Sequence, residues 1–575
     1  MDYVIHCRIR NLILALAAVL FCAANLNAQL GKEDIRASFR SRYGEGNQTK
    51  VLFGADKDVR KHYLENRLDL EYGRGLIEAG LSAESREPAE FGENFSRIRK
   101  GFLQYADSRY TLRLGTLYSL SGQGLTFNLL EDRKLDFDNT IRGFQGVVRL
   151  EKVRFQALAG TGNYADYNSP LVIDRHALAA LNLEYEPANG VSFGINTLHD
   201  RLTKRKDLQS RDHLEVDAKI PTWIWGPYMG ITAKQWEFFV EYSGKHTGRN
   251  RLGLPEDVYQ LPIRLLGLGK DVSGKGLYWN LGYSQKGYGF SLEYKNYQYN
   301  VTGSGTSYSS AGPDPAGALP YQNPPTAVKE HLYILLSRFP ILSNTNNEIG
   351  FELELNARPS RALAIQAVAS ATSKADILLP ATGSEKQGRD RGGFPLIPRF
   401  NTRYNPIYDS FLELRWRKGR ILQISGGGGF RNFTEYSVPG KFGKRTSLWT
   451  LPAKIQLRWS RRFTTLLDLE TQHVTEKYFP SGPPEKSYFN NYLGLTLSLA
   501  PVASITLSRE FTSDDNNSPG ARKSWNMIST NLRFSKWGDL ALSYGWQRKG
   551  MFCSNGLCRH VPGFKGLRAE MSIFY

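Results

Sequence analysis

The stretch EIGFELELNA, residues 348–357, alternates strictly between apolar and polar side chains. Its apolar positions are Ile349, Phe351, Leu353, Leu355 and Ala357. Because successive side chains of a strand point to opposite faces, one face of this strand is apolar and the other carries full charges such as Glu352 and Glu354. A soluble sandwich cannot bury unpaired charges at this frequency. The pattern instead indicates a strand with lipid on one side and water on the other.

The same alternation recurs along the whole chain. It is found in FLELRWRKG (411–419), KIQLRWSRR (454–462) and YLGLTLSLA (492–500). Aromatic residues stand at strand ends, as in YGFSLEYKNY (288–297) and DLALSYGW (539–546), where side chains at a membrane interface are expected. Segments of about ten residues with these features are typical of transmembrane β-barrels.

The connections between the predicted strands alternate in length. Short links such as QKGY (285–288) and RKGR (417–420) are separated by long loops over residues 247–275, 299–328 and 372–405. Short periplasmic turns and long extracellular loops are the layout of outer-membrane barrels. The fold class predicted is therefore all-β: one large antiparallel transmembrane barrel over residues 29–575, with about 24 strands and a range of 22 to 26.

Both ends of the sequence agree with export to the cell outer membrane. Arg8 and Arg10 precede the apolar run LILALAAVLFCAA, which is too short to span a bilayer, and Ala28 is a small residue suited to cleavage. Residues 1–28 therefore read as a signal peptide. At the other end, GLRAEMSIFY stops on the aromatic Tyr575, which resembles the C-terminal signal that the barrel-assembly machinery recognises.

The net charge and the cysteines restrict which environment and which binding partners are expected. The chain carries a formal net charge of +19, and without residues 1–28 it keeps +18. This charge suits a surface near outer-membrane lipid and lipopolysaccharide, or a path for an anionic solute; because it is spread along the chain, nucleic acid is not an expected partner. Cys553 and Cys558 flank an Asn-Gly turn signal, so a disulfide across a hairpin tip is predicted.

Three stretches resemble an uncharacterised outer-membrane β-barrel family of Bacteroidota. They are YSLSGQGLTFNLLEDRKLDFDNTIRGFQG (118–146), LYWNLGYSQKGYGFSLEYKNYQYN (277–300) and PPTAVKEHLYILLSRFPILSNTNNEIGFELEL (324–355). In the first, a Gly-x-Gly-Leu is followed by an acidic-Arg pair and an Asp-Asn segment, although a second acidic residue and a Gly expected near Asp136 are missing. The resemblance implies a fold and a compartment, and it brings no substrate.

The segment 120–142 is too long for a turn and carries both signs of charge. It is a candidate constriction of the lumen, in which Arg133 and Arg142 face acidic residues across the pore. The candidate residues are Glu131, Asp132, Arg133, Asp136, Asp138 and Arg142. The alternatives are a surface loop held by its own ion pairs and a calcium site at DFDN, which lacks the third acid and the Gly of a regular calcium loop.

Motifs for enzymes and cofactors do not appear. The eight histidines after residue 28 form no metal-binding pair, there is no Gly-x-Ser-x-Gly, and Gly122 and Gly124 precede no helix signal that would indicate a phosphate loop. No enzyme, metal or cofactor is therefore predicted. The run SGGGGF (425–430) lies inside a strand pattern and indicates a bend or a place where another backbone approaches closely.

Two functions remain open. A barrel of about 24 strands has a lumen too wide to be filled by its own wall, which favours a pore or passive transporter for a mid-sized solute. The basic net charge favours an anionic solute for such a path. A TonB-driven receptor needs an N-terminal plug domain, and few residues separate Gln29 from the first strand candidate, so this subclass is disfavoured. The alternative is a non-conducting barrel that binds at the surface or serves envelope or secretion assembly.

Overall fold

The structure is a computed structural model of the whole chain. It describes residues 35–52, 55–92, 94–135, 137–165, 172–208, 214–248, 272–299, 319–326, 328, 330–341, 346–377, 393–438, 442–479, 482, 484–515, 522–554 and 557–575. The predicted signal peptide, residues 1–28, lies outside the described residues. No helix in the described ranges is long and apolar enough to cross a membrane.

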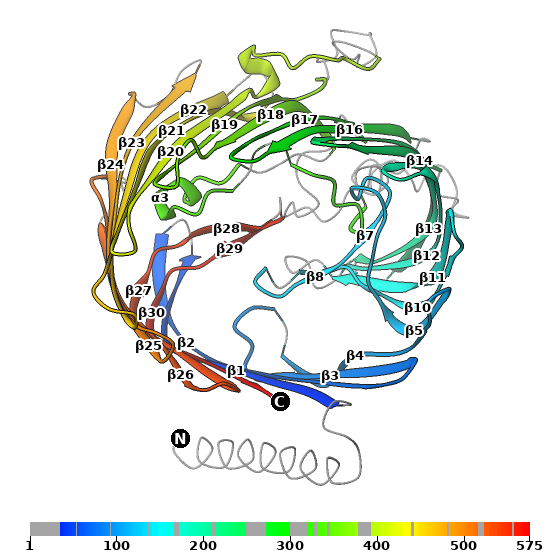
Figure 1. Cartoon of the computed structure of the whole chain (residues 1–575), viewed down its shortest axis with the longest axis horizontal. Helices are drawn as coiled ribbons and strands as arrows, with labels where there is room; N and C mark the ends of the chain where they lie inside the picture. Colours follow the sequence, from blue (N-terminus) through cyan, green and yellow to red (C-terminus); the bar gives the residue numbers. More distant parts are fainter. Residues whose placement is uncertain are drawn as a thin grey trace.

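The described strands form a closed antiparallel ring, seen from its open end in Figure 1. The ring is one 24-stranded sheet, which confirms the predicted fold class and strand number. Its first half consists of β1 (Ile35–Leu52), β2 (Ala55–Arg74), β3 (Ile77–Arg86), β4 (Phe95–Ala106), β5 (Tyr110–Leu117), β10 (Ile141–Arg149), β11 (Val153–Ala165), β12 (Val172–Ala188), β13 (Val191–Leu208), β14 (Leu214–Ala233), β15 (Trp236–Thr247) and β16 (Val272–Gln285). Its second half consists of β17 (Tyr288–Gln298), β18 (Asn347–Ala357), β19 (Leu363–Ser373), β20 (Ile407–Lys418), β21 (Leu422–Val438), β22 (Phe442–Arg458), β23 (Phe463–Phe479), β24 (Lys486–Leu499), β25 (Ala503–Thr512), β26 (Ser524–Ser535), β27 (Gly538–Gln547) and β30 (Phe564–Phe574).

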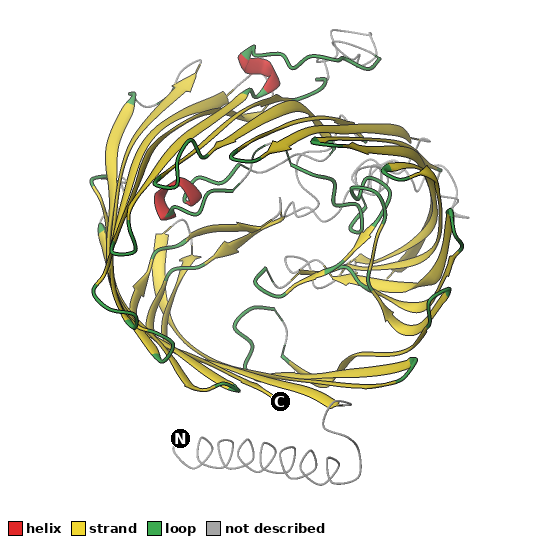
Figure 2. Cartoon of the chain, viewed as in Figure 1, coloured by secondary structure: helices red, strands yellow, loops and turns green. Residues whose placement is uncertain are grey.

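Eight short elements of the described residues lie outside this ring of paired strands. They are β6 (Ser119–Leu120), β7 (Asn128–Leu129), β8 (Glu131–Asp132), β9 (Phe137–Asp138), β28 (Gly550–Ser554), β29 (Leu557–Val561), the α-helix α3 (Ile334–Ser337) and the 3-10 helix η2 (Thr402–Tyr404). In Figure 1, β7, β8, α3 and the β28–β29 hairpin lie within the outline of the ring. Figure 2 shows one of the two short helices inside the ring and the other, η2, outside it.

The last strand closes the ring on the first. β30 pairs with β1 from Ser38 opposite Phe574 to Gln48 opposite Phe564, and with β27 on its other side. Tyr575 continues the ladder, since its N–H donates to the carbonyl of Ala37 over 2.8 Å and its own carbonyl accepts from the Ala37 N–H over 3.0 Å. This closure leaves the sheet without an open edge, which a β-structure in lipid requires.

The two faces of the wall differ as the alternation predicts. Exposed apolar side chains point outward, for example Leu112 and Leu114 on β5 and Leu412 and Leu414 on β20. Inward positions carry buried charges such as Glu413 on β20. An apolar outer surface on a closed antiparallel barrel is the architecture of an outer-membrane protein, and the chain is placed in the outer membrane on this ground.

Short turns join the strands at the periplasmic end. Lys286 and Gly287 alone connect β16 to β17, and Gly287 has a φ of +86°, a left-handed conformation that favours glycine in two-residue hairpin turns. Of the three long loops expected, the described parts show two different courses. Residues 319–326, 328 and 330–341 turn into the ring, whereas residues 393–405 lie against its outer side.

The cysteine pair lies on the β28–β29 hairpin. Cys553 and Cys558 stand directly opposite each other in the register of these strands, as a cross-strand disulfide requires. The structure describes the backbone of these two cysteines but not their side chains, so the disulfide stays a prediction.

We expect negligible reaction of the intact, unreduced protein with a maleimide reagent. After reduction under denaturing conditions, two thiols of the chain without its signal peptide should react. Strong labelling before reduction, located at either cysteine by mass spectrometry, would contradict the disulfide.

Candidate functional site in the barrel lumen

Two segments far apart in the sequence enter the lumen. We call residues 118–140 the inner loop and residues 319–341 the strap, leaving out the positions 136, 327 and 329 that the structure does not describe. The inner loop follows β5, and the strap contains α3 (Figure 1). Together they make the lumen a structured site rather than an empty channel.

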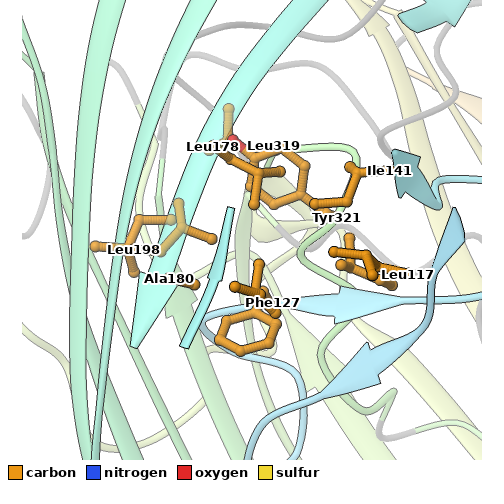
Figure 3. Close-up of a cluster of buried hydrophobic side chains, with 11 residues drawn as sticks. Leu117, Phe127, Ile141, Leu178, Ala180, Leu198, Leu319 and Tyr321 are labelled. Atoms are coloured by element: carbon orange, nitrogen blue, oxygen red, sulfur yellow. The ribbon is translucent and has the colours of Figure 1, made fainter. Parts of the chain in front are cut away.

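An apolar patch on the inner wall holds one end of both segments. Inward side chains of β11 to β14 contribute Leu158, Leu178, Ala180, Leu198 and Ile224. The inner loop adds Phe127 and Leu129, the strap adds Leu319 and Tyr321, and Leu117 and Ile141 on the flanking wall strands complete the cluster (Figure 3). Because each fully buried Leu or Phe contributes on the order of 2 kcal/mol, this patch drives the two segments onto the wall.

The two segments also bond directly to each other. The Asn128 N–H donates to the carbonyl of Tyr321 over 2.6 Å, and the side-chain amide of Gln322 donates to the carbonyl of Leu125 over 2.6 Å. Asn139 donates from its side chain to the carbonyls of Asn128 and Pro320. These bonds satisfy backbone groups that have no strand partner, so each segment depends on the other.

The glycines of the inner loop allow this close packing. Gly122 has a φ of +54°, and a Cβ there would lie 2.3 Å from a carboxylate oxygen of Glu241 on β15. The same carboxylate accepts a hydrogen bond of 2.6 Å from the Gln123 N–H. Gly124, with a φ of +85°, faces the Asn323 carbonyl of the strap in the same way. The Gly-x-Gly therefore seats a backbone turn between wall and strap.

Charged residues hold the other end of the inner loop to the wall. Glu131 pairs with Arg67 of β2 over 2.7 Å and with Lys100 of β4 over 2.9 Å. Asp138 pairs with Lys100 over 3.0 Å and with Arg99 over 3.2 Å. The acidic groups of the loop are thus neutralised by basic groups of the neighbouring wall strands.

The six predicted constriction residues divide into four groups, of which Arg142 alone forms the last. Glu131, Asp138 and Arg133 take part in the network of ion pairs that joins the inner loop to β2 and β4. In this network, Arg133 lies 3.3 Å from Asp69 of β2. Asp132 instead shapes the turn, because its carboxylate accepts from the N–H groups of Lys134 and Leu135. Asp136 lies outside the described residues.

Arg142 lies apart from the acidic residues that it was expected to face. It occupies the strand face of β10 that also carries the exposed Phe144, and its guanidinium donates to the carbonyl of Arg99 over 2.7 Å. The physical reason is strand parity: Ile141, one residue earlier, takes the inward position and packs in the apolar patch. The ion pairs of the inner loop run to the adjacent wall and do not form a ring across the lumen.

Glu131 is the most strongly perturbed acid of the inner loop. Burial by itself would raise its pKa, but hydrogen bonds from Arg67 and the charges of Lys100 and Arg67 outweigh burial and lower the pKa to about 2. The carboxylate is therefore ionised at every physiological pH. Tyr118, which donates to it over 3.3 Å, has a raised pKa because of burial.

The strap is fixed at its second end by carboxylates of β20, β23 and β25. The Glu470 carboxylate accepts from the N–H groups of Ile334 and Leu335 at the start of α3, over 2.9 and 2.7 Å. His331 lies 3.0 Å from Asp409. Arg338 forms a two-pronged ion pair with Glu510. These contacts span three wall strands, so the strap crosses the lumen between two anchored ends.

The strap packs against the glycine run of β21. A Cβ at Gly429 would lie 2.9 Å from Leu336 of α3 and 3.3 Å from Phe411. By contrast, a Cβ at Gly428, on the other strand face, would meet nothing closer than 3.7 Å. The groups that come close to Gly429 are the side chains of Leu336 and Phe411, and not the backbone that the sequence-based interpretation of SGGGGF expected.

The loop between β3 and β4 also contributes a charged residue to the lumenal ion pairs. Glu90, in the loop between β3 and β4, forms an ion pair with Arg42 of β1, and its N–H donates to Glu65 of β2 over 2.9 Å. A small cavity of about 60 Å³ lies among these charges, next to Arg67 and Glu131. The lumenal side of β1 to β4 thus carries many charged side chains that form ion pairs with one another.

No metal centre is apparent in the described part of the chain. Within it, no group of three or more His, Cys, Asp or Glu side chains is arranged to hold an ion. Asp138, the described acid of the DFDN segment, is occupied by Arg99 and Lys100.

The apolar patch and the strap were not predicted from the sequence. A usable signal lies in ALAALNL, residues 177–183, where both faces of β12 are apolar over several positions. Such a run indicates that the inner face is covered as well as the outer one. The strap carries no comparable pattern, because its contacts are to distant strands.

We expect the inner loop to loosen in acid. Since the folded pKa of Glu131 is about 2 and lies below the ordinary 4.5, its ion pairs stabilise the loop fully above about pH 4.5, and this stabilisation is lost as the pH falls toward 2. The contribution at neutral pH is about 3 kcal/mol. A spin label at Lys134→Cys, in a background with Cys553 and Cys558 changed to Ser, should become mobile over this range. E131Q should give a mobile label already at pH 6; an immobile label there would contradict the role of Glu131.

We expect G429V to dislodge α3, because the new side chain overlaps Leu336 and overpacking costs about 1 to 3 kcal/mol. Trypsin cleavage after Arg338, followed by mass spectrometry of the folded barrel, should be faster than in the parent protein. G428V is the matched control, since it introduces the same residue on the open strand face. Equal cleavage of the two variants would show that the strap does not depend on this contact.

Comparisons with known proteins give a family and a likeness in fold. No curated protein matches the chain. The P pilus usher PapC translocation pore has a TM-score of 0.44 at 10% identity, with 94% of this chain and 99% of that chain covered. The siderophore receptors PirA from Pseudomonas aeruginosa and from Acinetobacter baumannii have TM-scores of 0.42 and 0.44 at 9% and 7% identity, each with 94% of this chain and 80% of that chain covered.

At these identities and TM-scores, the solved structures carry no argument about function. The family comparison is more extensive, because one family model matches residues 9–366 and 455–575. The match includes the inner loop, the strap and the closing strand β30. The chain therefore belongs to DUF6029, a family of unknown function.

Proposed function

We propose that this protein is a passive outer-membrane pore whose conducting path is narrowed by the inner loop and the strap. The observation that carries the proposal is that two segments almost 200 residues apart fold into the lumen, bond to each other and are anchored to opposite parts of the wall. Segments held in this way restrict what passes, as charged and apolar constrictions do in selective channels. The proposal includes no enzymatic activity, and it keeps the resemblance to a barrel family of Bacteroidota.

A concavity in the lumenal wall that carries polar and charged side chains supports the proposal. The periplasmic half of the lumenal wall holds a concavity of about 470 Å³, lined among others by Glu354, Gln366, Glu413 and Arg415. Such a surface favours water and hydrated solutes over apolar ligands. The solute class we propose is therefore a mid-sized hydrophilic molecule.

The preference for anions is the finer part of the proposal. It is supported by the net charge of +18 after the predicted signal cleavage. The network around the inner loop contributes little to it, because Arg67, Arg99 and Lys100 are matched by Glu131, Asp138 and Glu84. Any selectivity for anions must come from basic residues elsewhere along the path.

A barrel that binds a partner at the surface without conducting is the second candidate. It is favoured by the apolar residues of the loop outside the ring, where Leu396 and Ile397 are exposed. The two candidates differ in whether the lumen passes ions.

We expect steady single-channel openings of the refolded protein in a planar bilayer, with a reversal potential under a salt gradient that shows anion preference. E131Q should raise the conductance and the current noise, because it frees Arg67 and Lys100 and loosens the inner loop. D515N, at an exposed position between β25 and β26, is the control and should leave the currents unchanged. A silent membrane with correctly folded protein would contradict the pore and favour the non-conducting alternative.

A further inference from the structure

A short segment outside the ring covers part of the wall that should face lipid. We call residues 394–400, with the sequence FPLIPRF, the flap. The wall side chains beneath it occupy outward positions, as strand parity shows. On β18, Ile349 shares its face with Phe351 and Leu355, which are 39% and 45% exposed, yet Ile349 itself is 0% exposed because it packs with Tyr294 of β17 and with Ala375 of the segment after β19.

The flap is tied to the outer face across several strands. On β17, the Tyr294 hydroxyl donates to the Leu396 carbonyl over 2.9 Å, and the Asn296 side chain donates to the Pro395 carbonyl. On β19, Ser373 accepts from the Arg399 N–H over 3.0 Å. The Phe400 ring packs on Tyr408 of β20 at 5.1 Å between centroids. The Lys275 ammonium of β16 lies 4.6 Å from the centroid of the Phe394 ring. The flap therefore contacts β16, β17, β19 and β20.

The contacts lie within the height of the membrane. Tyr294 and Asn296 are six and eight residues above Tyr288, the exposed aromatic residue next to the periplasmic turn. A strand tilted by about 40° rises roughly 2.5 Å per residue along the membrane normal, which places these residues about 15 and 20 Å above that turn. The apolar band of such barrels is about 25 Å tall, so the flap lies against its upper part.

The exposed side of the flap is apolar. Leu396 and Ile397 are 68% and 72% exposed, and Phe400 is partly exposed beside them. At a similar height on other strands, the outward residues are exposed aromatics such as Trp225 on β14 and Trp449 on β22. The flap thus replaces, over β16 to β20, the apolar surface that the bare strands present elsewhere.

The composition of the flap suits a position in lipid. Irregular backbone there must hide its polar groups, and Pro395 and Pro398 have no N–H to hide. The carbonyls of Pro395 and Leu396 are satisfied by Asn296 and Tyr294. Arg399 is exposed and ends the apolar tip, where anionic headgroups of an outer leaflet would meet it.

We propose that the flap is a lipid-contact surface of the barrel, in which Leu396, Ile397 and Phe400 enter the outer leaflet of the membrane. It continues the lipid-facing wall and shields Asn296, which is 0% exposed at this depth, from the acyl chains. The proposal is independent of whether the lumen conducts.

Depth-dependent fluorescence quenching tests this proposal. Single cysteines at Ile397 and, as a second flap position, Leu396 are introduced into full-length protein with C553S and C558S, labelled with bimane and reconstituted in vesicles containing doxyl-labelled phospholipids. Leu412, on the lipid-facing wall of β20, is the positive control, and Asp515, on an exposed extracellular loop, is the aqueous control.

Labels at Ile397 and Leu396 should lose fluorescence to an extent comparable to the label at Leu412, with the stronger effect from doxyl groups near the headgroups. The label at Asp515 should lose little. Quenching at both flap positions no greater than at Asp515, in protein that keeps its heat-modifiable folded form on gels, would overturn the proposal and place the flap in water or against a protein partner.

Discussion

The need to satisfy every backbone polar group in lipid governs this structure. An open sheet edge within a bilayer costs several kcal/mol for each unpaired group. The pairing of β30 with β1 removes that edge, and Tyr575 extends the ladder to Ala37. Once 24 strands close in this way, the lumen is wider than the wall side chains can fill, so the chain must either leave it to water or send other segments into it.

The lumen shows how the chain meets this second demand. Inward leucines of β12 and β13 form an apolar surface whose exposure to water would be unfavourable. The inner loop and the strap cover this surface. Elsewhere the same segments are held by charges, such as Glu131 against Arg67 and Lys100. Apolar contact fixes where the segments dock, and ion pairs fix their orientation. Removing one charged partner would leave the other buried and unpaired, at a cost of about 3 to 5 kcal/mol.

The alternation of residues 348–357 was enough to predict the wall, because side-chain parity and lipid exposure follow directly from a period of two. It could not predict the segments inside. Arg142 shows the limit: its charge suggested a lumenal role, but its parity is set by Ile141, whose burial depends on β11 and the inner loop. The contacts of Leu336 with Gly429 and of Gln322 with Leu125 join residues 93 and 197 positions apart, and no local pattern encodes such pairs.

The two sides of the wall treat irregular backbone by the same rule but with different chemistry. Inside, carboxyl groups accept hydrogen bonds from N–H groups that have no strand partner: Glu241 accepts from Gln123, and Glu470 accepts from the first N–H groups of α3. Outside, neutral side chains bond to the backbone of the flap: Tyr294 and Asn296 donate to its carbonyls, and the Ser373 hydroxyl accepts from the Arg399 N–H. A carboxyl group is tolerated on the lumenal side of the wall, whereas an ionised carboxylate in hydrocarbon costs more than the hydrogen bond returns. Neutral amides also bond to the backbone inside the ring, as Asn139 and Gln322 do, so the partner alone does not separate the two sides. The carboxyl groups of Glu241 and Glu470 mark the inner loop and the strap as segments inside the lumen, and the neutral partners Tyr294 and Asn296 agree with the lipid contact proposed for the flap.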